Sequence, residues 1–357
     1  MGANKVLSPE ASWLAARKVK KFASTGRPVV SCEDRETVAE VMQKLVDNRV
    51  LACPVYHHGT NGFIGLIDMM HIINFLTDLH WHLNHESPSY RDADYQNNFT
   101  TTPIHSLLPD LKKRTTPYNP APYHTAWVPH TATYLDVAKV MVQSGEFRVA
   151  VVEEGRGKGL KIGDGSVLHI VTQREMIELL FDGLGDIPIN FQIKPIRAFT
   201  QTPPEPTPIH NTARAIEAFR VLISTHVTAV PIVTGPPSSQ TLFGSISIHH
   251  IRRLASNASN VRVLYDEDCG TFCKRGGGVR RGSLGSSLDI AQSVEATTGG
   301  AGEDEGEVMG VSLKDSVRTV MEKLNGNKCH RCWVVEGGKV LGQVSLFDIL
   351  REMIGDA

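Results

Sequence analysis

One unit occurs four times along this chain, and the repetition limits the fold more than any other feature. Its clearest copy lies between Lys328 and Arg351, where an apolar run, a Gly337-Gly338 turn and a second apolar run precede a helical pattern. Glycine permits the positive φ of a tight hairpin, so the two apolar runs of this copy are predicted to be paired strands. With the helical patterns before and after them, each copy is predicted to be helix, strand, strand, helix. Such a unit cannot bury its own faces, so the copies are expected to stack on one another.

The predicted repeats are separated by segments of different composition. An N-terminal extension (1–28) is interpreted as a solvated amphipathic helix. A polar, proline-rich insertion (84–123) is interpreted as an extended loop, a connector (186–206) as partly extended, and a second insertion (257–306) as mostly disordered. The repeats themselves are predicted at 29–83, 124–185, 207–256 and 307–357.

Composition limits the partners that the whole molecule can attract. The 37 basic and 38 acidic residues give a formal charge of -1, so no global field favours nucleic acid or an anionic membrane. No apolar run approaches the roughly 20 residues of a membrane span. Six cysteines in 357 residues do not form a disulfide scaffold, and the N-terminus lacks a signal-peptide pattern. These features predict a cytoplasmic protein that could also enter the nucleus.

The chain lacks the motifs of common enzymes. No nucleophile-and-base constellation, no phosphate-binding G-x-x-x-x-G-K-[ST] loop and no kinase signature set is found. We therefore expect a non-catalytic protein.

The fourth repeat contains the text HRCWVVEGGKVLGQVSLFDIL, and this unit resembles the cystathionine β-synthase (CBS) domain. Four such repeats in one chain are similar to the γ regulatory subunit of AMP-activated (sucrose-non-fermenting-type) protein kinase. The resemblance implies an α/β (α+β) fold in which the repeats pair as two Bateman modules in a disc-like array. It also implies AMP, ADP or ATP as ligands and the catalytic α and scaffold β subunits of a Ser/Thr kinase as partners.

The resemblance assigns the nucleotide-binding residues. It implies that Asp348 holds the ribose hydroxyls, that Ser345 donates to phosphate, and that His330 and Arg331 contact phosphates, with Thr228 of the third repeat beside Asp348. Ser247 keeps the hydroxyl of the third repeat. The second repeat offers the phosphate-contacting Arg148, together with Thr172 and with Arg174 where the family has a lysine.

Simpler interpretations of these residues remain open. Ser345 and Asp348, like Thr172 and Glu175, also fit a capping pair at a helix start, and His330-Arg331 fits a surface cation pair. Histidine replaces the ribose-binding aspartate at His71 and His250, and this predicts fewer nucleotide sites than in the family. A stand-alone CBS-domain adapter that binds an adenosyl ligand and regulates another enzyme or a transporter is the alternative function. The lost acids at His71 and His250 also leave open a purely structural array.

Metal binding is not expected. His80, His82 and His85 have a ligand-like spacing without a nearby acidic partner, and the paired cysteines are interpreted as buried thiols. Ser283 lies in a basic pattern that resembles a kinase substrate.

Overall fold

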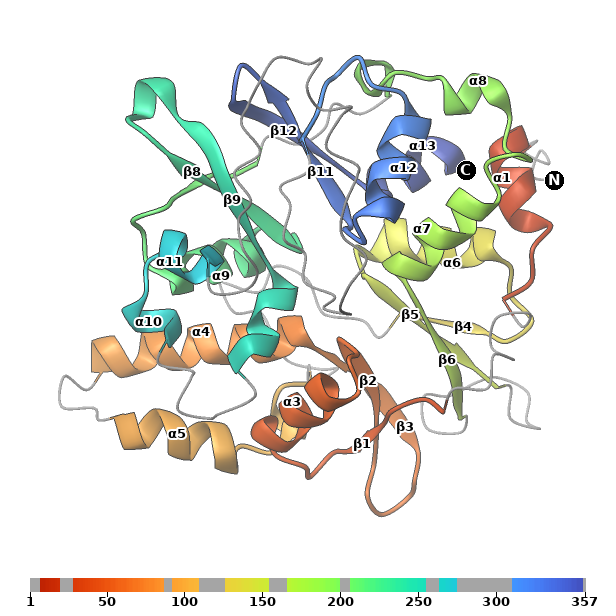
Figure 1. Ribbon diagram of the computed structural model, residues 1–357. Coiled ribbons are helices and arrows are strands. Elements are labelled where there is room, and N and C mark those ends of the chain that lie inside the picture. Colours follow the sequence, from red (N-terminus) through yellow and green to blue (C-terminus); the bar gives the residue numbers. More distant parts are fainter. Residues whose placement is uncertain are drawn as a thin grey trace, which may run out of the picture.

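The computed structural model describes residues 7–19, 28–86, 92–108, 126–153, 166–199, 206–254, 263–274 and 310–355 (Figure 1). Within them lie four three-stranded sheets, one for each repeat. Among these residues no helix is long and apolar enough to span a membrane.

All four sheets have the same topology. A short first strand pairs in parallel with the second strand, which pairs in antiparallel with the third. The sequence missed these first strands, because segments of two or three residues are too short to show an alternating pattern. The strands are β1 (Cys32–Glu33), β2 (Ala52–Tyr56), β3 (Phe63–Asp68), β4 (Trp127–Pro129), β5 (Arg148–Val152), β6 (Val167–Thr172), β7 (Ile209–His210), β8 (Ala229–Thr234), β9 (Thr241–Ser247), β10 (Gly310–Val311), β11 (Arg331–Glu336) and β12 (Lys339–Ser345).

Two helical segments flank the second and third strands of each repeat. The first precedes them and buries an apolar stripe, such as Val38, Val41, Met42 and Leu45 in the first repeat. The second begins directly after the third strand; in the third repeat it is a 3-10 segment. They are α3 (Val38–Asp47) and α4 (Met69–Glu86), α6 (Tyr134–Ser144) and α7 (Gln173–Asp182), α9 (Ala215–Ser224) and η4 (Ile248–Leu254), and α12 (Val317–Gly326) and α13 (Leu346–Ile354).

Each first helix is braced at its start by a segment from outside the predicted repeats. An isolated antiparallel bridge joins the N-cap residue of the helix to this segment in all four repeats, and we call the second member of each pair its brace residue. The pairs are Thr37 with Pro103, Thr133 with Lys18, Arg214 with Asp268, and Ser316 with Pro195. Within each pair of repeats the braces are interlaced, because the segment before the first repeat braces the second repeat.

These bracing segments correct four sequence interpretations. The N-terminal helix α1 (Pro9–Ala15) is not solvated, since Ala11 and Leu14 are fully buried. The insertion after the first repeat holds α5 (Asp92–Thr101) and η1 (Ile104–Ser106), and the connector holds α8 (Ile189–Gln192) and η2 (Ile196–Ala198) in place of extended chain. The insertion after the third repeat holds α10 (Val263–Asp266) and α11 (Cys269–Lys274).

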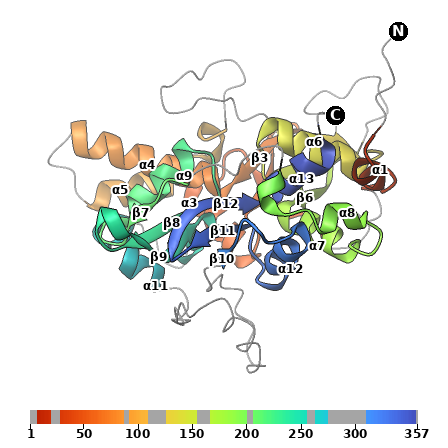
Figure 2. The same cartoon turned by 90° about the horizontal axis from the view of Figure 1, so that it is seen from above.

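Packing links the repeats in two ways. The helices of repeats 2 and 4 form one apolar core with α1, and the helices of repeats 1 and 3 form another with α10 and α11. Sheets meet within the pairs 1/2 and 3/4, where the Tyr56 hydroxyl accepts the Val167 amide at 3.1 Å and the Gly338 carbonyl accepts the Leu242 amide at 3.0 Å. The Phe147 and Phe347 rings lie 5.5 Å apart. The array is wider than it is thick when seen from above (Figure 2), which confirms the predicted disc of paired repeats.

Candidate functional site

The register of the hairpins brings equivalent residues to the start of every second helix. The last residue of each third strand faces the first residue of the second strand, as Ser345 faces Arg331 in the fourth repeat. Three residues later comes the position that Asp348 occupies in the fourth repeat. The resulting pairs are Asp68 with His71, Thr172 with Glu175, Ser247 with His250, and Ser345 with Asp348.

Asp348 closes the start of its own helix. Its Oδ2 accepts hydrogen bonds from the amide and the hydroxyl of Ser345, both at 2.7 Å. Its Oδ1 lies 3.5 Å from the Arg351 guanidinium, and 12% of the side chain is exposed. The capping interpretation of these two residues is therefore confirmed, and a ribose diol at Asp348 would replace these hydrogen bonds.

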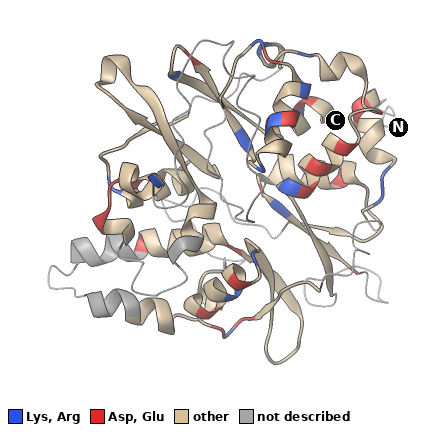
Figure 3. Ribbon diagram, in the orientation of Figure 1, with Lys and Arg blue, Asp and Glu red and all other residues tan. Residues whose placement is uncertain are grey.

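Arg331 connects the fourth repeat to the third. Its guanidinium donates to the Thr228 hydroxyl at 2.6 Å and to the Ala229 carbonyl at 3.2 Å, and it also donates to the Gln343 side chain. Figure 3 shows few charged residues on the strands, apart from positions such as those on β5 and β11. Arg331 is thus a cation that crosses the boundary between two repeats, rather than a surface charge beside one sheet.

The imidazoles of His249 and His330 complete this junction. Their ring centroids are 5.3 Å apart, and His249 belongs to the third repeat. Nearby, the Ser247 hydroxyl lies 3.0 Å from Nδ1 of His250. The structure therefore gathers predicted residues at one boundary, which we call the 3/4 junction: His330, Arg331, Ser345, Asp348, Thr228 and Ser247. The sequence missed His249, although its adjacency to His250 at a helix start was a usable signal.

At the equivalent boundary of repeats 1 and 2, which we call the 1/2 junction, the charged side chains pair with one another. Arg148 is only 7% exposed, and its guanidinium lies 2.9 Å from Oδ2 of Asp68. The other oxygen of Asp68 lies 2.8 Å from Nδ1 of His71. The cation that was predicted to contact phosphate is therefore already paired with a buried carboxylate.

Glu146 adds a second carboxyl to the 1/2 junction. Burial by itself would raise the pKa of Asp68. The neighbouring His71 and Arg148 have the larger, opposite effect and lower this pKa to about 2. Burial and the Asp68 charge together raise the pKa of Glu146 to about 7. The two carboxyls thus differ in ionisation, because only one of them has a direct ion pair with Arg148.

Two other predicted residues of the second repeat make contacts at helix ends, and one of them, Thr172, also faces Arg148 across the hairpin. The Thr172 hydroxyl accepts the Glu175 amide at 3.3 Å, as expected of a cap. The Arg174 guanidinium donates to the Asn325 carbonyl at 3.1 Å and to the Asn325 side chain at 3.0 Å, near the end of α12. Arg174 therefore joins the helices of repeats 2 and 4, where a cation suits the carbonyl end of a helix.

The structure describes some of the remaining sequence candidates and leaves others outside its described residues. Of the four paired cysteines that were interpreted as buried thiols, Cys269, Cys273 and Cys332 are buried and free, whereas Cys329 is free and only partly buried. The side chains of His80, His82 and His85, and the whole of the Ser283 segment, lie outside the residues that the structure describes.

Comparisons with known proteins agree with this architecture. Residues 19–78 and 306–355 match the family model of the CBS domain. No curated protein matches the sequence. A protein from Methanocaldococcus jannaschii, described as a candidate archaeal homolog of γ-AMPK, is similar in structure with a TM-score of 0.64 and 12% identity, over 94% of this chain and 99% of that one.

Two further structures are similar over less of the chain and with lower TM-scores. An uncharacterized conserved protein from Pyrococcus horikoshii gives a TM-score of 0.44 with 15% identity, over 85% of this chain and 91% of that one. The CBS domain of a bacterial CNNM/CorC Mg²⁺ transporter in complex with ATP gives 0.29 with 15% identity, over 47% and 90%. At these identities the similarity concerns the fold, and of these three structures the Methanocaldococcus protein supports it across the chain.

Proposed function

We propose that this chain, which is built from CBS repeats, is a non-catalytic regulatory subunit that binds AMP, ADP or ATP at the 3/4 junction. The observation that carries the proposal is the contact of Arg331 with Thr228 at 2.6 Å, since it places a cation and hydroxyls of two repeats at one boundary. The γ subunit of a heterotrimeric Ser/Thr kinase is the role that best fits four paired repeats.

The chemistry of the 3/4 junction suits a nucleotide. An ionised carboxylate such as Asp348 accepts hydrogen bonds only, so its two oxygens can receive both hydroxyls of a ribose. Arg331 supplies a permanent cation for phosphate, and α13 directs its free backbone amides toward its N-terminus. Binding would exchange the internal hydrogen bonds of Asp348 and Arg331 for bonds to the ligand.

The 1/2 junction is a poorer candidate for the same ligand. A phosphate there would have to compete with Asp68 for Arg148, and it would also meet the carboxyl of Glu146. We therefore expect one occupied site at the 3/4 junction in preference to the 1/2 junction.

Calorimetry with AMP tests the site. Asp348→Ala removes charge-assisted hydrogen bonds worth about 1.5–3 kcal/mol each, so AMP affinity should fall at least about tenfold. Loss of the helix cap accompanies this change, and Asp136→Ala is the matched control. Asp136 closes α6 with Thr133 in the same way, with its Oδ2 2.8 Å from both the Thr133 amide and hydroxyl. Asp136→Ala should therefore leave AMP affinity unchanged.

Arg331→Met gives a second, independent test of the 3/4 junction. Its loss should weaken ATP and ADP binding, because their phosphates need the cation. Unchanged nucleotide affinity in both Asp348→Ala and Arg331→Met would reject this location.

Copurification of the full-length chain tests the role in a kinase. A catalytic Ser/Thr kinase subunit and a β subunit should be recovered from cytoplasmic or nuclear extracts under mild conditions. A nucleotide can alter kinase activity only if it binds two states of the complex with different affinity, so the recovered kinase should respond to AMP. Recovery of a different enzyme or a transporter would favour the alternative, a stand-alone adapter that binds an adenosyl ligand. The histidines that replace carboxylates at His71 and His250 favour a third possibility, an array of repeats that is purely structural.

A further inference from the structure

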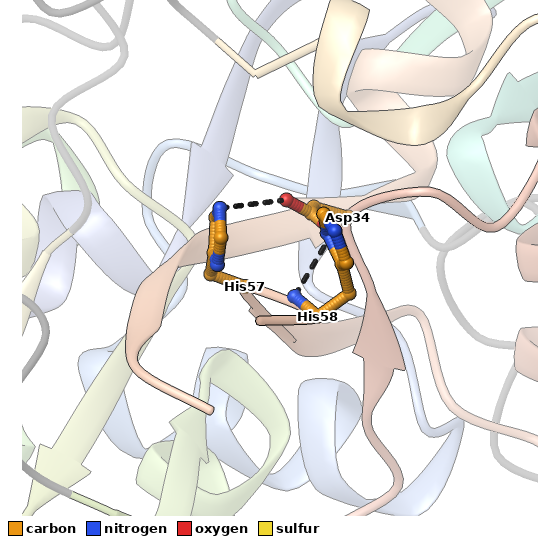
Figure 4. Close-up of side chains that lie close together, drawn as sticks. All are labelled: Asp34, His57 and His58. Atoms are coloured by element: carbon orange, nitrogen blue, oxygen red, sulfur yellow. Dashed lines mark hydrogen bonds and ion pairs between the residues drawn. The ribbon is translucent and has the colours of Figure 1, made fainter. Parts of the chain in front are cut away.

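Three side chains of the kinds that bind metal ions lie together where β1 and β2 of the first sheet end. Asp34 directly follows β1, and His57 and His58 directly follow β2. Because β1 and β2 are parallel, their ends lie side by side, with Glu33 opposite Tyr56. Figure 4 shows both imidazoles beside the carboxylate. Nδ1 of His58 lies 3.0 Å from Oδ1 of Asp34, and Nε2 of His57 lies 3.9 Å from Oδ2.

The backbone holds the carboxylate in place. Asp34 Oδ1 accepts the His58 amide at 3.2 Å, the Asp34 amide donates to the Tyr56 carbonyl at 3.0 Å, and the Asp34 carbonyl accepts the His105 amide at 3.0 Å. Only 12% of the Asp34 side chain is exposed, compared with 43% for His57 and 46% for His58. A buried carboxylate and two half-exposed imidazoles therefore lie together at the surface, where an ion can reach them.

The fold does not require this trio. Aligned by strand register, the other repeats carry different residues at the end of the first strand and after the second strand. Asp34 corresponds to His130, Asn211 and Leu313, and His57 corresponds to Glu153, Thr234 and Glu336. The same turn is thus built without a carboxylate and two imidazoles in repeats 2, 3 and 4.

We propose that Asp34, His57 and His58 bind a divalent transition-metal ion. Two imidazole nitrogens and one carboxylate oxygen are the donors of many Zn²⁺ and Fe²⁺ sites, and the exposed side leaves coordination positions for water or another ligand. The three ligand atoms already lie within 4.8 Å of one another. Tetrahedral Zn²⁺ with bonds of about 2.0–2.1 Å needs ligand atoms about 3.4 Å apart, so side-chain movements of about 1 Å suffice.

Ion binding changes which nitrogen of each histidine ring carries the proton. Without an ion, Nδ1 of His58 shares a proton with Asp34, while Nδ1 of His57 accepts the Gly59 and Thr60 amides at 3.1 and 3.3 Å. Coordination through Nδ1 of His58 and Nε2 of His57 moves the proton of each neutral ring to its other nitrogen. The Gly59–Thr60 turn must then release His57, which couples the metal to this hairpin loop.

The location separates this site from the 1/2 junction. Asp68 pairs with Ala52 at the first residue of β2, whereas His57 follows its last residue, Tyr56. The metal site thus lies at the opposite end of the strand, and its test does not depend on nucleotide binding.

Titration of the untagged full-length chain with Zn²⁺ tests the proposal. Calorimetry should show a site that is weakened more than about tenfold in His57→Ala and His58→Ala, because losing a ligand costs at least as much as losing an outer-shell partner. Asp34→Asn should have the same effect while keeping an acceptor for the His58 amide. His105→Ala is the matched control, since its ring contacts the Asp34 carbonyl and lies outside the trio. Its Zn²⁺ affinity should be unchanged.

The absorption spectrum of bound Co²⁺ distinguishes this site from cysteine ligation. Nitrogen and oxygen ligands should give visible bands without the intense near-ultraviolet absorption of a Co²⁺-thiolate, and these bands should disappear in His57→Ala. A thiolate spectrum, no Zn²⁺ binding by the parent chain, or Zn²⁺ affinity unchanged in both histidine variants would overturn the proposal.

Discussion

Individual side chains at the two junctions differ chiefly in how their charges are balanced. At the 3/4 junction Arg331 contacts neutral oxygen acceptors, whereas at the 1/2 junction Arg148 is buried against Asp68. The sequence offered the Ser345–Asp348 cap as the simpler interpretation of these two residues, because they are three positions apart at a helix start. It could not predict the Arg148–Asp68 pair, since that contact depends on how two repeats stack.

Glu146→Gln tests the electrostatics of the 1/2 junction. The pKa of Glu146 in the folded protein, about 7, lies above its ordinary value of 4.5. Between these values the unfolded chain loses the proton that the folded chain keeps, so the parent protein loses stability as pH rises and then levels off. Glutamine does not titrate. The variant should therefore gain roughly 1–3 kcal/mol relative to the parent between about pH 4.5 and 7.

Denaturant unfolding at several pH values measures this difference. Glu178→Gln, at an exposed ion pair on α7, controls for the loss of one negative charge. A difference between Glu146→Gln and the parent that stays constant from acidic to neutral pH would contradict the assigned pKa.

Secondary-structure elements were predicted well where the sequence pattern is local. The hairpins and their flanking helical segments follow from alternating and helical periodicity, and all four repeats have them. The bracing segments were missed because their partners are remote in sequence. Lys18, for example, pairs with Thr133, and nothing in the amino-acid sequence near either residue indicates that contact.

Gly183→Ala tests how closely α1 docks. A Cβ on Gly183, just after α7, would lie 2.0 Å from the Trp13 ring, so alanine must displace this side chain of α1. We expect a loss of about 1–3 kcal/mol in the free energy of unfolding. Gly185→Ala is a close control, because a Cβ there meets nothing within 4 Å. Equal stability of the two variants in denaturant titrations would show that α1 is not packed as described.

The whole molecule depends on contacts that cross between its two pairs of repeats. Repeats 1 and 3 share one core, and repeats 2 and 4 share the other. The resemblance to a known family predicted the pairing and the disc. It did not indicate which helices meet, because that is decided by packing among segments far apart in the chain.

Coexpression of chain fragments tests this organisation. Residues 1–185 and 186–357 each keep their own brace residues and should copurify as a one-to-one complex, since each completes the cores of the other. A fragment of residues 206–357 lacks Pro195, the brace residue of α12, and its complex with 1–185 should melt at a lower temperature. Stable, monomeric and cooperatively folding 186–357 on its own would contradict the shared cores. Light scattering and circular dichroism distinguish these outcomes.

The interlaced braces also set an order of events during synthesis. Lys18 leaves the ribosome before any of the first repeat, yet its partner Thr133 belongs to the second repeat. Pro195 likewise precedes the third repeat and must wait for Ser316 in the fourth. Neither pair of repeats can form both of its bridges until its second repeat has been made, and neither apolar core is complete until repeats of both pairs are present.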